Sequence, residues 1–595
     1  MKKIQLLMLL MLPCCLLFGQ NGEIKSFKII SATKGGFNGI TSPDFTFFGK
    51  SVNNIGDLDL DGIDDYCVGA SDNNALVGNL FVLFMDKNFN VKSYTRIAPN
   101  IGGFNGSFNN NMRSFASTIT SVDLNKDGVN EVILGNSTGG GNNTGEVYIL
   151  FLNKNGTVSK WTSIGSNNVL LTNSQYFGIS LDQIGDLNKD GSNDIVVGSV
   201  TSLMIVFLDS SGDVKSSQKI SKQDGNFKGV LGLSSIGFGV AQIGDLNKDG
   251  NIDLISSSIG GGWPNYTGSA LWILYLNSNG SVKSHLKIDN DSSQYMDTIR
   301  SYESFGSIIS NLNDLDGDGN PDVAVTSLQD SVNNSRTGRV RILFFNSNGT
   351  VKSIKRIDNN ATNFSGILKD GDNFGSGLSG GFDLDGDFKN DLLVGALRTD
   401  DGGTDKGAIY LLSLDGAVHP TPPKALWRVN ATSGNQNTVF NFTQYSTGFP
   451  SAYKWSITPN TFTYQSGTSD TSANPIIKFN QTANYSVQLK VTNPFSSDSL
   501  LRSSYISIQK VGINNLTNNN STISIFPNPT NGLVQIQSPI TIQSILVFDI
   551  TGKQLLQQAP NTQTDEINIS NLPQGLYQIH VQTAMGVLVK KLVKE

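Results

Sequence analysis

The chain is poor in the side chains that most often carry out catalysis or bind nucleic acids. Only 15% of its 595 residues are charged, and it has three histidines. These are His285, His419 and His580, which lie far apart in the sequence. No histidine–carboxylate arrangement of an enzyme can therefore be assembled from the sequence. No basic tract with interleaved aromatic residues is present, which argues against a nucleic-acid partner.

Cysteine is almost absent as well, with three in the whole chain. Two of them lie in an apolar run, residues 4–18, that follows a pair of lysines. This pattern predicts a secretory signal peptide over residues 1–20. The run is too short to span a bilayer unaided, so we expect no transmembrane segment after cleavage. The mature chain keeps one cysteine, Cys67, so it forms no internal disulfide; its surroundings are typical of a buried strand.

Acidic residues are concentrated in six loops of nine residues, with oxygen-bearing side chains at positions 1, 3, 5 and 9. Their first aspartates are 59 to 69 residues apart, and the ligand sets are Asp57, Asp59, Asp61 and Asp65; Asp123, Asn125, Asp127 and Glu131; Asp186, Asn188, Asp190 and Asp194; Asp245, Asn247, Asp249 and Asp253; Asp314, Asp316, Asp318 and Asp322; and Asp383, Asp385, Asp387 and Asp391. Such oxygens suit a hard cation. The alternative is a solvated acidic turn without metal, but close carboxylates repel unless a cation neutralises them.

The residues around each loop repeat too. An aromatic–glycine step precedes the loops, at Phe48-Gly49, Phe177-Gly178, Phe238-Gly239, Phe305-Gly306 and Phe374-Gly375, with Phe115-Ala116 in the second repeat. Short apolar runs follow each loop, and an Asn-Gly pair such as Asn155-Gly156 often precedes the last run. Asn-Gly predicts a tight hairpin in which both residues have positive φ. Four short strands per repeat, without helical periodicity, predict an all-β chain with a β-propeller.

These residues resemble the FG-GAP repeats of integrin α-subunit propellers, over about residues 24–415. The resemblance implies a propeller that holds calcium between the first two strands of each blade, about one Ca²⁺ per acidic loop and up to six. Integrin propellers have seven repeats, whereas six complete ones are present here. Residues 23–29 match last-strand runs such as residues 351–357. We therefore expect them to complete the sixth blade and close a six-bladed ring; a seventh, degenerate blade is the alternative.

The chain beyond the propeller divides into further parts. We place the propeller at residues 21–418 and a proline-rich, semi-rigid linker at 419–426. Alternating apolar and polar runs over 427–511 predict a β-sandwich. It resembles a PKD-like, immunoglobulin-type module through a Tyr-x-Trp run and a Tyr-Ser-Val-Gln-Leu-Lys-Val run, and Trp455 is expected in its core. The polar stretch 512–522 predicts a flexible tether.

Residues 523–595 resemble a type A C-terminal sorting domain of the type IX secretion system. The matching blocks, in family order, are Pro527-Asn-Pro529, Gly552-Lys553, the run from Leu572 to Tyr577, and Lys590-Lys591. From the residues themselves we predict another small β-sandwich. The resemblance implies contact with the type IX machinery, transport across the outer membrane of a Gram-negative bacterium, and a secreted or cell-surface protein, either released or anchored.

Two function classes remain open. The favoured one is adhesion or ligand binding, with a protein or glycan ligand and no catalysis. The alternative is a secreted polysaccharide-acting enzyme, or its accessory subunit, that uses the propeller face as a cleft. Residues 377–381 match G-x-S-x-G and residues 375–380 match G-x-G-x-x-G. Both lie in a predicted strand and lack the strand-to-helix turn that either motif requires.

The sixth loop departs from the others at position 6, where five loops have glycine and this one has Phe388. A non-glycine residue in the left-handed region costs roughly 1–2 kcal/mol. The loop keeps all four carboxylates, so we expect it still to bind calcium. Because of the strain at position 6, we expect it to bind calcium more weakly than the loop of Asp314, and we expect Phe388→Gly to tighten binding.

Overall fold

The computed structural model describes residues 21–40, 44–72, 77–106, 112–140, 143–165, 175–229, 235–259, 269–290, 297–300, 303–330, 336–509, 523–584 and 586–595. The predicted signal peptide and the predicted tether lie outside these residues. All elements of regular structure in the described part are β-strands, which confirms the all-β prediction. None of the described residues forms a helix that is long and apolar enough to span a membrane.

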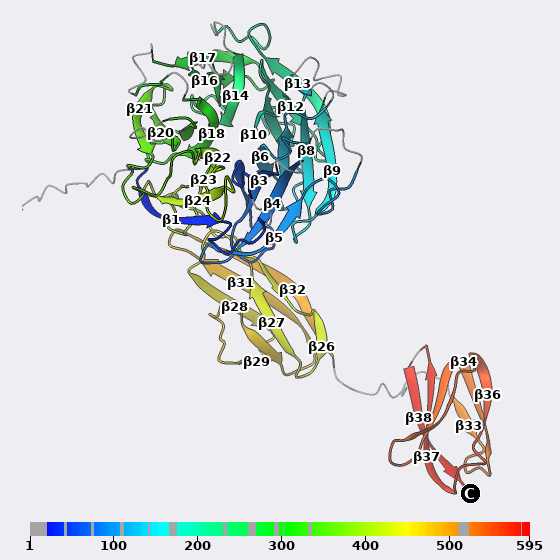
Figure 1. Cartoon of the computed structure of the whole chain (residues 1–595). Coiled ribbons are helices and arrows are strands. Elements are labelled where there is room, and N and C mark those ends of the chain that lie inside the picture. Colours follow the sequence, from blue (N-terminus) through cyan, green and yellow to red (C-terminus); the bar gives the residue numbers. More distant parts are fainter. Residues whose placement is uncertain are drawn as a thin grey trace, which may run out of the picture. The chain divides into compact units, whose positions relative to one another are not determined.

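Six four-stranded antiparallel sheets form the blades of a propeller (Figure 1). Five of them use consecutive strands: β2 (Ser51–Gly56), β3 (Asp65–Asp72), β4 (Val77–Met85) and β5 (Val91–Ile97); β6 (Thr118–Val122), β7 (Glu131–Asn136), β8 (Glu146–Leu152) and β9 (Val158–Gly165); β10 (Ser180–Gly185), β11 (Asp194–Gly198), β12 (Leu203–Leu208) and β13 (Val214–Ile220); β14 (Ser235–Gln242), β15 (Leu254–Ile259), β16 (Ala270–Leu276) and β17 (Val282–Ile288); β18 (Phe305–Asn313), β19 (Asp322–Ser327), β20 (Arg339–Phe345) and β21 (Val351–Ile357).

The sixth blade joins the two ends of the propeller. It consists of β22 (Phe374–Phe382), β23 (Asp391–Ala396), β24 (Ala408–Leu414) and the N-terminal strand β1 (Ile24–Ser31). Strand β1 pairs antiparallel with β24, with Ile29 opposite Tyr410. The predicted closure by residues 23–29 is therefore confirmed, and so is the six-bladed ring.

The hydrophobic core is divided among the six gaps between neighbouring blades. One cluster joins blades one and two and contains Cys67, which is fully buried. Equivalent clusters fill the next four gaps. The last cluster joins Leu393 and Ile409 of blade six to Phe48 and Val68 of blade one. Because the gap between the last and first blades is filled in this way, the ring has no space for a seventh blade.

Hydrogen bonds of one kind link neighbouring blades. The hydroxyl of Ser51 donates to the carbonyl of Ala116 in the next blade at 2.7 Å, and Thr118 and Ser180 make the same type of bond. The hydroxyl of Ser376 in blade six donates to the carbonyl of Gly49 in blade one at 2.8 Å, which completes the circle. Blades approach so closely here that a Cβ on Gly395 would lie 1.9 Å from the Gly49 oxygen.

Residues 427–509 form two four-stranded sheets around one core. One sheet has the order β25 (Trp427–Val429), β27 (Val439–Gln444), β30 (Ile476–Phe479) and β29 (Phe462–Gln465); the other has β26 (Ser433–Asn435), β32 (Ser497–Gln509), β31 (Ala483–Thr492) and β28 (Ala452–Thr458). Trp455 is 2% exposed in this core, and its indole N–H donates to the carbonyl of Ser472 at 2.9 Å. The assignment to a PKD-like family stays a prediction.

The C-terminal residues form one sheet with its own apolar core. Its strands are β33 (Ser524–Phe526), β34 (Leu533–Phe548), β35 (Gln554–Gln558), β36 (Thr562–Asn568), β37 (Gly575–Thr583) and β38 (Gly586–Lys594). The long strand β34 pairs with four others. Different parts of β34 pair with different partners, and β38 joins the sheet through β37.

The described chain divides into two compact units. The first holds the six blades, the chain to Lys424 and two turns at residues 444–451 and 492–498. The second holds the remaining residues from 425 onward. The domain limits set out above stay a prediction.

Candidate functional site: six acidic loops

The six acidic loops occupy equivalent places in the propeller. Each connects the first strand of a blade to the second, as residues 57–64 connect β2 to β3. In every blade the first strand begins near the aromatic–glycine step and ends at the loop. All six loops therefore lie at the same end of the ring.

The carboxylate at position 1 holds each loop closed from within. Asp314 Oδ1 accepts the N–H of Asp318 at 3.0 Å, and its Oδ2 accepts the N–H of Gly319 at 2.8 Å. The same two bonds, to positions 5 and 6, are made by Asp57, Asp123, Asp186 and Asp245. Asp383 accepts from positions 4 and 6. Position 1 thus fixes the turn that brings the later ligands back toward it.

The oxygens at positions 3 and 5 face the same turn. At position 5, one carboxylate oxygen accepts the N–H of position 7, as Asp61 does from Ile63 at 3.0 Å. At position 3, Asn125, Asn188, Asn247 and Asp385 accept the N–H of position 5. In the first and fifth loops, by contrast, Asp59 Oδ1 and Asp316 Oδ1 are buried and accept no hydrogen bond from the described residues. A buried carboxylate oxygen without a partner requires a cation or a donor.

The position-9 carboxylate is buried and accepts hydrogen bonds from both the loop and the blade. Asp322 is fully buried; its Oδ2 accepts the N–H of Leu315 at 2.9 Å, and its Oδ1 accepts the N–H of Phe345, in the third strand, at 3.2 Å. Asp65, Asp194, Asp253 and Asp391 make the same pair of bonds, and Glu131 makes the first of them. In Asp65, Asp253 and Asp322 the Oδ2 atom also accepts the N–H of position 3 at 3.3–3.4 Å. The Oδ1 atom accepts one N–H and keeps a second lone pair, so these residues remain compatible with metal coordination.

The loop backbone is left-handed at two positions in every blade. Position 6 has φ of +85 to +93° at its five glycines and +65° at Phe388, which confirms the expected positive φ. Position 4 is left-handed as well, at Leu60, Lys126, Lys189, Lys248, Gly317 and Gly386. The requirement at position 4 could not be predicted from the residues, because only two of the six loops have glycine there.

Burial disfavours the charged forms of these carboxylates. Burial, together with a smaller contribution from nearby loop aspartates, raises the pKa of Asp65, Asp322 and Asp391 to about 8. It also raises the pKa of Asp57 and Asp383 to about 6, against hydrogen bonds from the loop backbone that lower it. A divalent cation among these groups would favour their charged forms.

The donor sets fit calcium. Oxygens bound to one calcium ion lie within about 5 Å of one another, because each Ca–O distance is about 2.3–2.6 Å. Three groups have one oxygen per residue within 4.8 Å of the others: Asp57, Asp59 and Asp61; Asp314, Asp316 and Asp322; and Asp383, Asp385 and Asp391. In loops two to four an asparagine replaces the position-3 carboxylate, so those loops offer fewer charges.

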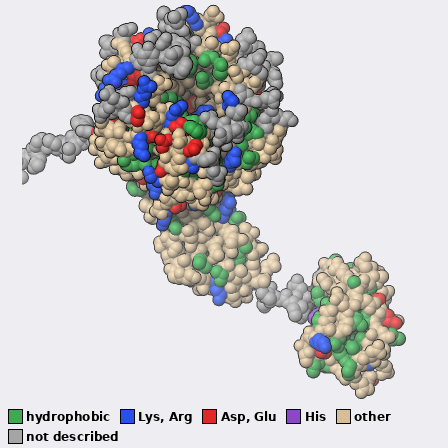
Figure 2. All heavy atoms as spheres, in the orientation of Figure 1, with side chains coloured by type: hydrophobic (Ala, Val, Ile, Leu, Met, Phe, Trp, Pro, Cys, Tyr) green, Lys and Arg blue, Asp and Glu red, His purple; other side chains and the backbone are tan. Residues whose placement is uncertain are grey.

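A lysine of the outermost strand reaches the loop in five blades. Lys352 Nζ lies 2.7 Å from both Asp316 and Asp318. Lys92 contacts Asp59 at 2.7 Å and also Asp61, while Lys215, Lys283 and Lys25 contact the position-5 aspartates 190, 249 and 387. Figure 2 shows acidic and basic side chains beside one another on the propeller face turned to the viewer.

The second blade has Ser159 in place of this lysine, and its hydroxyl donates to the carbonyl of Phe151. These lysine contacts were not predicted from the sequence. Their signal was a repeated Val-Lys-Ser at the start of the last strand, with Ile-Lys-Ser in β1.

The sixth loop compensates for its unusual residue by packing. The ring of Phe388 meets the rings of Phe449 and Phe495 edge-to-face, with centroids 5.8 and 4.8 Å apart. Both partners lie in the turns that belong to the same compact unit as the propeller. Each such contact contributes about 0.5–1.5 kcal/mol, which is comparable to the strain.

Two sequence predictions are wrong in detail. In the fourth repeat the residues that correspond to the aromatic–glycine step are Ile236 and Gly237, not Phe238-Gly239. Ile236 is fully buried, Gly237 has φ of +111°, and its carbonyl accepts the inter-blade bond from Ser180. In the Asn-Gly turns only the glycine has positive φ. Asn155 instead accepts the N–H of Thr157 through its side chain, so the turn is longer than a two-residue hairpin.

The chance motifs and histidines do not assemble into one site in the described residues. Ser379 lies within strand β22, and its Oγ accepts the N–H of Asn54 at 3.2 Å. His285 packs against Phe227 and Trp272, and His580 packs against Phe548. These side chains belong to separate elements.

Comparison with known proteins agrees with both resemblances. The FG-GAP repeat model matches residues 115–150, 305–343 and 374–412, and the model of a secretion system C-terminal sorting domain matches residues 524–595. Mouse integrin alpha-2 is 36% identical over 104 residues, which is 17% of this chain and 9% of the integrin. Chicken integrin alpha-6 is 31% identical over 156 residues, which is 25% of this chain and 13% of the integrin.

The matched segments thus span about a tenth of those relatives. Among solved structures, PorZ, a surface component of the type IX secretion system of Porphyromonas gingivalis, aligns over 92% of this chain and 75% of its own. Its identity of 11% and TM-score of 0.29 are too low to support an argument. This chain therefore carries integrin-like FG-GAP repeats in a β-propeller and a secretion-system sorting domain. It is a secreted or cell-surface protein of a Gram-negative bacterium.

Proposed function

We propose that this protein is a calcium-binding β-propeller that acts outside the cell by binding a protein or a glycan, without catalysis. The observation that carries the calcium part is the common geometry of the six loops, with carboxylates that burial leaves uncompensated. Asp59 Oδ1 and Asp316 Oδ1 support it most directly, because each is buried without a hydrogen bond from the described residues. The proposal includes all 24 residues that the sequence predicts as calcium ligands, four in each loop.

In this proposal calcium has a structural role. When bound, the ion supplies two positive charges, which offset part of the negative charge of the three or four carboxylates in each loop. The chain itself supplies the rest: the position-1 aspartate shapes the turn, and the position-9 residue ties it to the second and third strands. The loops therefore stabilise the end of the ring at which they lie, and we expect a ligand to bind elsewhere on the propeller.

The binding role is tested with an array of glycans and matrix proteins, probed with the mature protein in calcium and in EDTA. We expect retention of specific ligands in calcium and its loss in EDTA, because the propeller is weakened without the ion. A mature protein that folds in calcium yet retains nothing on the array would contradict the binding role. Release of oligosaccharides from a spotted polysaccharide would instead favour the enzyme alternative.

We also propose that residues 523–595 are recognised by the type IX secretion machinery. Deleting them should leave the propeller folded but strand the protein in the periplasm. Fractionation with an antibody against the propeller would measure this, and full-length protein is the control. A truncated protein that still reaches the medium or the cell surface would refute the assignment of the export signal.

A further inference from the structure

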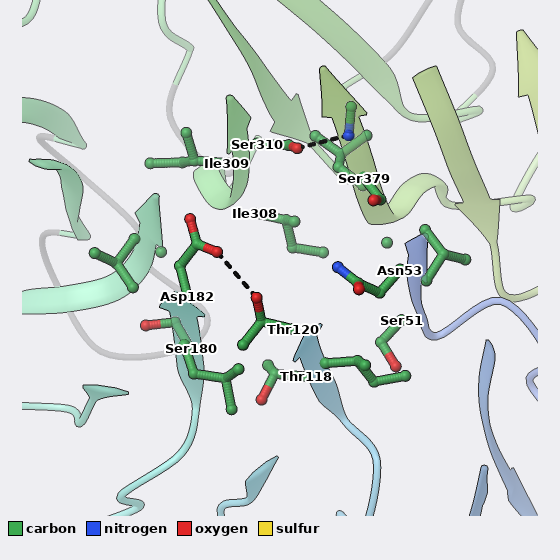
Figure 3. Close-up of a pocket in the computed structure, with 18 of the residues that line it drawn as sticks. Ser51, Asn53, Thr118, Thr120, Ser180, Asp182, Ile308, Ile309, Ser310 and Ser379 are labelled. Carbon is green, nitrogen blue, oxygen red and sulfur yellow. Dashed lines mark hydrogen bonds between the residues drawn. The ribbon is translucent and has the colours of Figure 1, made fainter. Parts of the chain in front are cut away.

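A cavity of about 590 Å³ lies on the axis of the propeller. Its lining comes from the first strands of all six blades, β2, β6, β10, β14, β18 and β22, and from residues beside them (Figure 3). This volume is within the range of pockets that hold small organic ligands. It borders the acidic loops at one end, where Asn130 of the second loop, Gly56 and Phe382 belong to the lining.

The cavity wall is rich in hydroxyl and amide groups. The hydroxyls of Ser51, Thr118 and Ser180 already donate to inter-blade carbonyls, so these three offer a ligand acceptor oxygens only. Its polar side chains include Ser51, Asn53, Thr118, Thr120, Ser180, Ser310 and Ser379, and Figure 3 shows them around one space. Ile308, Ile309 and Leu378 add apolar surface. Hydroxyl and amide groups interleaved with aliphatic ones match a polyhydroxylated ligand, which presents hydroxyls at its edge and C–H groups on its faces.

Two charged residues line the cavity, and they differ in how well they are satisfied. The carboxylate of Asp182 accepts the hydroxyl of Thr120 at 3.1 Å, the N–H of Gln183 at 2.8 Å and the N–H of Gln242 at 2.9 Å. Burial raises the pKa of Asp182 to about 6, but these three hydrogen bonds favour its charged form and occupy the carboxylate. Lys50 is half-buried, and its ammonium has no acceptor or counter-ion among the described residues. The charge that the cavity leaves without a partner is positive.

Lys50 is not required by the repeat. At the same place, the second residue after the aromatic, the other blades have Ser117, Ile179, Phe238, Ser307 and Ser376, counting from Ile236 in the fourth blade. Burial lowers the pKa of Lys50 to about 8, which shows that the site disfavours an unpaired ammonium. A charge that is both costly and peculiar to one blade indicates a function other than folding.

The two charged groups stand at different depths along the axis. Lys50 directly precedes β2, at the end of the ring opposite the acidic loops, whereas Asp182 is three residues further along its own repeat. At the rise of an extended strand this is roughly 10 Å. A ligand with its anionic group at Lys50 would therefore extend its neutral, hydroxylated part toward Thr120 and Asp182.

We propose that the axial cavity binds a small sugar acid, with its carboxylate paired to Lys50 and its hydroxyls bonded to the ring of serine, threonine and asparagine side chains. The proposal rests on the proposed binding function and names a ligand class for it. The ammonium–carboxylate pair is a charge-assisted hydrogen bond, which is stronger than a bond between neutral groups. Neutral sugars share the hydroxyls but lack this pair.

Titration calorimetry of the mature full-length protein in calcium tests the proposal, with glucuronate, glucose and inorganic phosphate as probes. We expect glucuronate to bind at least tenfold more tightly than either of the others. Lys50→Met should lower glucuronate affinity at least tenfold and leave glucose affinity unchanged, while Lys50→Arg retains part of the preference. Lys87→Met, an equal charge change at an exposed turn outside the cavity, should have no effect.

The outcomes separate this inference from the proposed function. Glucuronate binding that is absent, that equals phosphate binding, or that survives in Lys50→Met overturns the sugar-acid site. If the array still retains a ligand in calcium, the binding function stands and its site lies elsewhere on the propeller. An unchanged melting temperature of Lys50→Met in calcium shows that the variant is folded.

Discussion

The fifth and sixth loops build the same turn from different residues. Position 6 is Gly319 in one and Phe388 in the other, with φ of +85 and +65°. In both, the position-6 N–H donates to the first aspartate, at 2.8 and 2.6 Å. The space around the two positions differs: a Cβ on Gly319 would meet nothing within 4 Å, whereas Phe388 packs against two phenylalanines.

Position 6 of the loop therefore requires a left-handed backbone rather than a glycine. The first aspartate needs the position-6 N–H, and that bond requires a left-handed residue. Glycine adopts this shape without strain. A phenylalanine adopts it where contacts elsewhere offset roughly 1–2 kcal/mol. The ligand geometry is thus the constant feature, as expected if every loop serves the same ion.

Removal of calcium should have the largest effect, because it acts on all six loops at once. At 1 mM calcium and a dissociation constant of about 10⁻⁴ M, each site contributes about 1.4 kcal/mol. Six sites contribute about 8 kcal/mol, which lowers the melting temperature of a 400-residue domain by on the order of 10 °C. Calorimetry of the mature protein in calcium and in EDTA measures this. Equal melting temperatures would mean that the loops do not depend on a metal.

Exchanging the position-6 residues should change the stability of the propeller to different extents in the fifth and sixth loops. Gly319→Phe introduces strain without an aromatic partner, so we expect it to destabilise the propeller by about 1–2 kcal/mol. Phe388→Gly relieves strain but loses two aromatic contacts, so its stability should change by less than about 1 kcal/mol. Calcium affinity at the sixth site should rise in Phe388→Gly.

Denaturant titration and titration calorimetry on both variants provide the measurement. Similar losses of stability in the two variants would show that the packing around Phe388 does not offset its strain. Equal or weaker calcium binding by Phe388→Gly would show that strain at position 6 does not limit affinity.

The fold could be predicted from the sequence because its signals repeat. The six acidic loops and the aromatic–glycine steps recur in order, and residues 23–29 match a last-strand run. In the fourth repeat the predicted aromatic–glycine step is displaced by two residues, because Phe238-Gly239 has the same residue types as the motif. Burial decides between the candidates: Ile236 is fully buried in the core and Phe238 is not.

The loop chemistry was predictable only in part. Ligand spacing predicted the positions proposed here to bind metal, but hydrogen bonds to the backbone are not visible in a sequence. The left-handed position 4 is occupied by leucine or lysine in four loops, residues without any preference for that shape. In four of the five blades that are continuous in sequence, a lysine contacts a loop aspartate that lies 25 to 36 residues earlier in the chain, so these contacts could be found only once the strand pairing was known.

The lysines should have the smallest effect. Lys352→Met removes a partly exposed ion pair, so stability in EDTA should fall by about 1 kcal/mol or less. Calcium affinity at the fifth loop should rise several-fold, because a competing positive charge is lost. The matched change is Ser159→Lys in the second blade, which should weaken calcium binding there and stabilise the protein in EDTA. Site-resolved calorimetry that found no opposite trend would show that the lysines do not compete with the ion.

The number of calcium ions bound per chain decides whether the six acidic loops are calcium sites. Native mass spectrometry of the mature protein in volatile buffer with added calcium should show up to six bound ions. Asp314→Ala removes the position-1 ligand of the fifth loop and should lower the number by one, whereas Asp209→Ala, in an exposed turn with no loop ligand, should not. A count of zero, or one that does not change in Asp314→Ala, would contradict the assignment of the acidic loops as calcium sites.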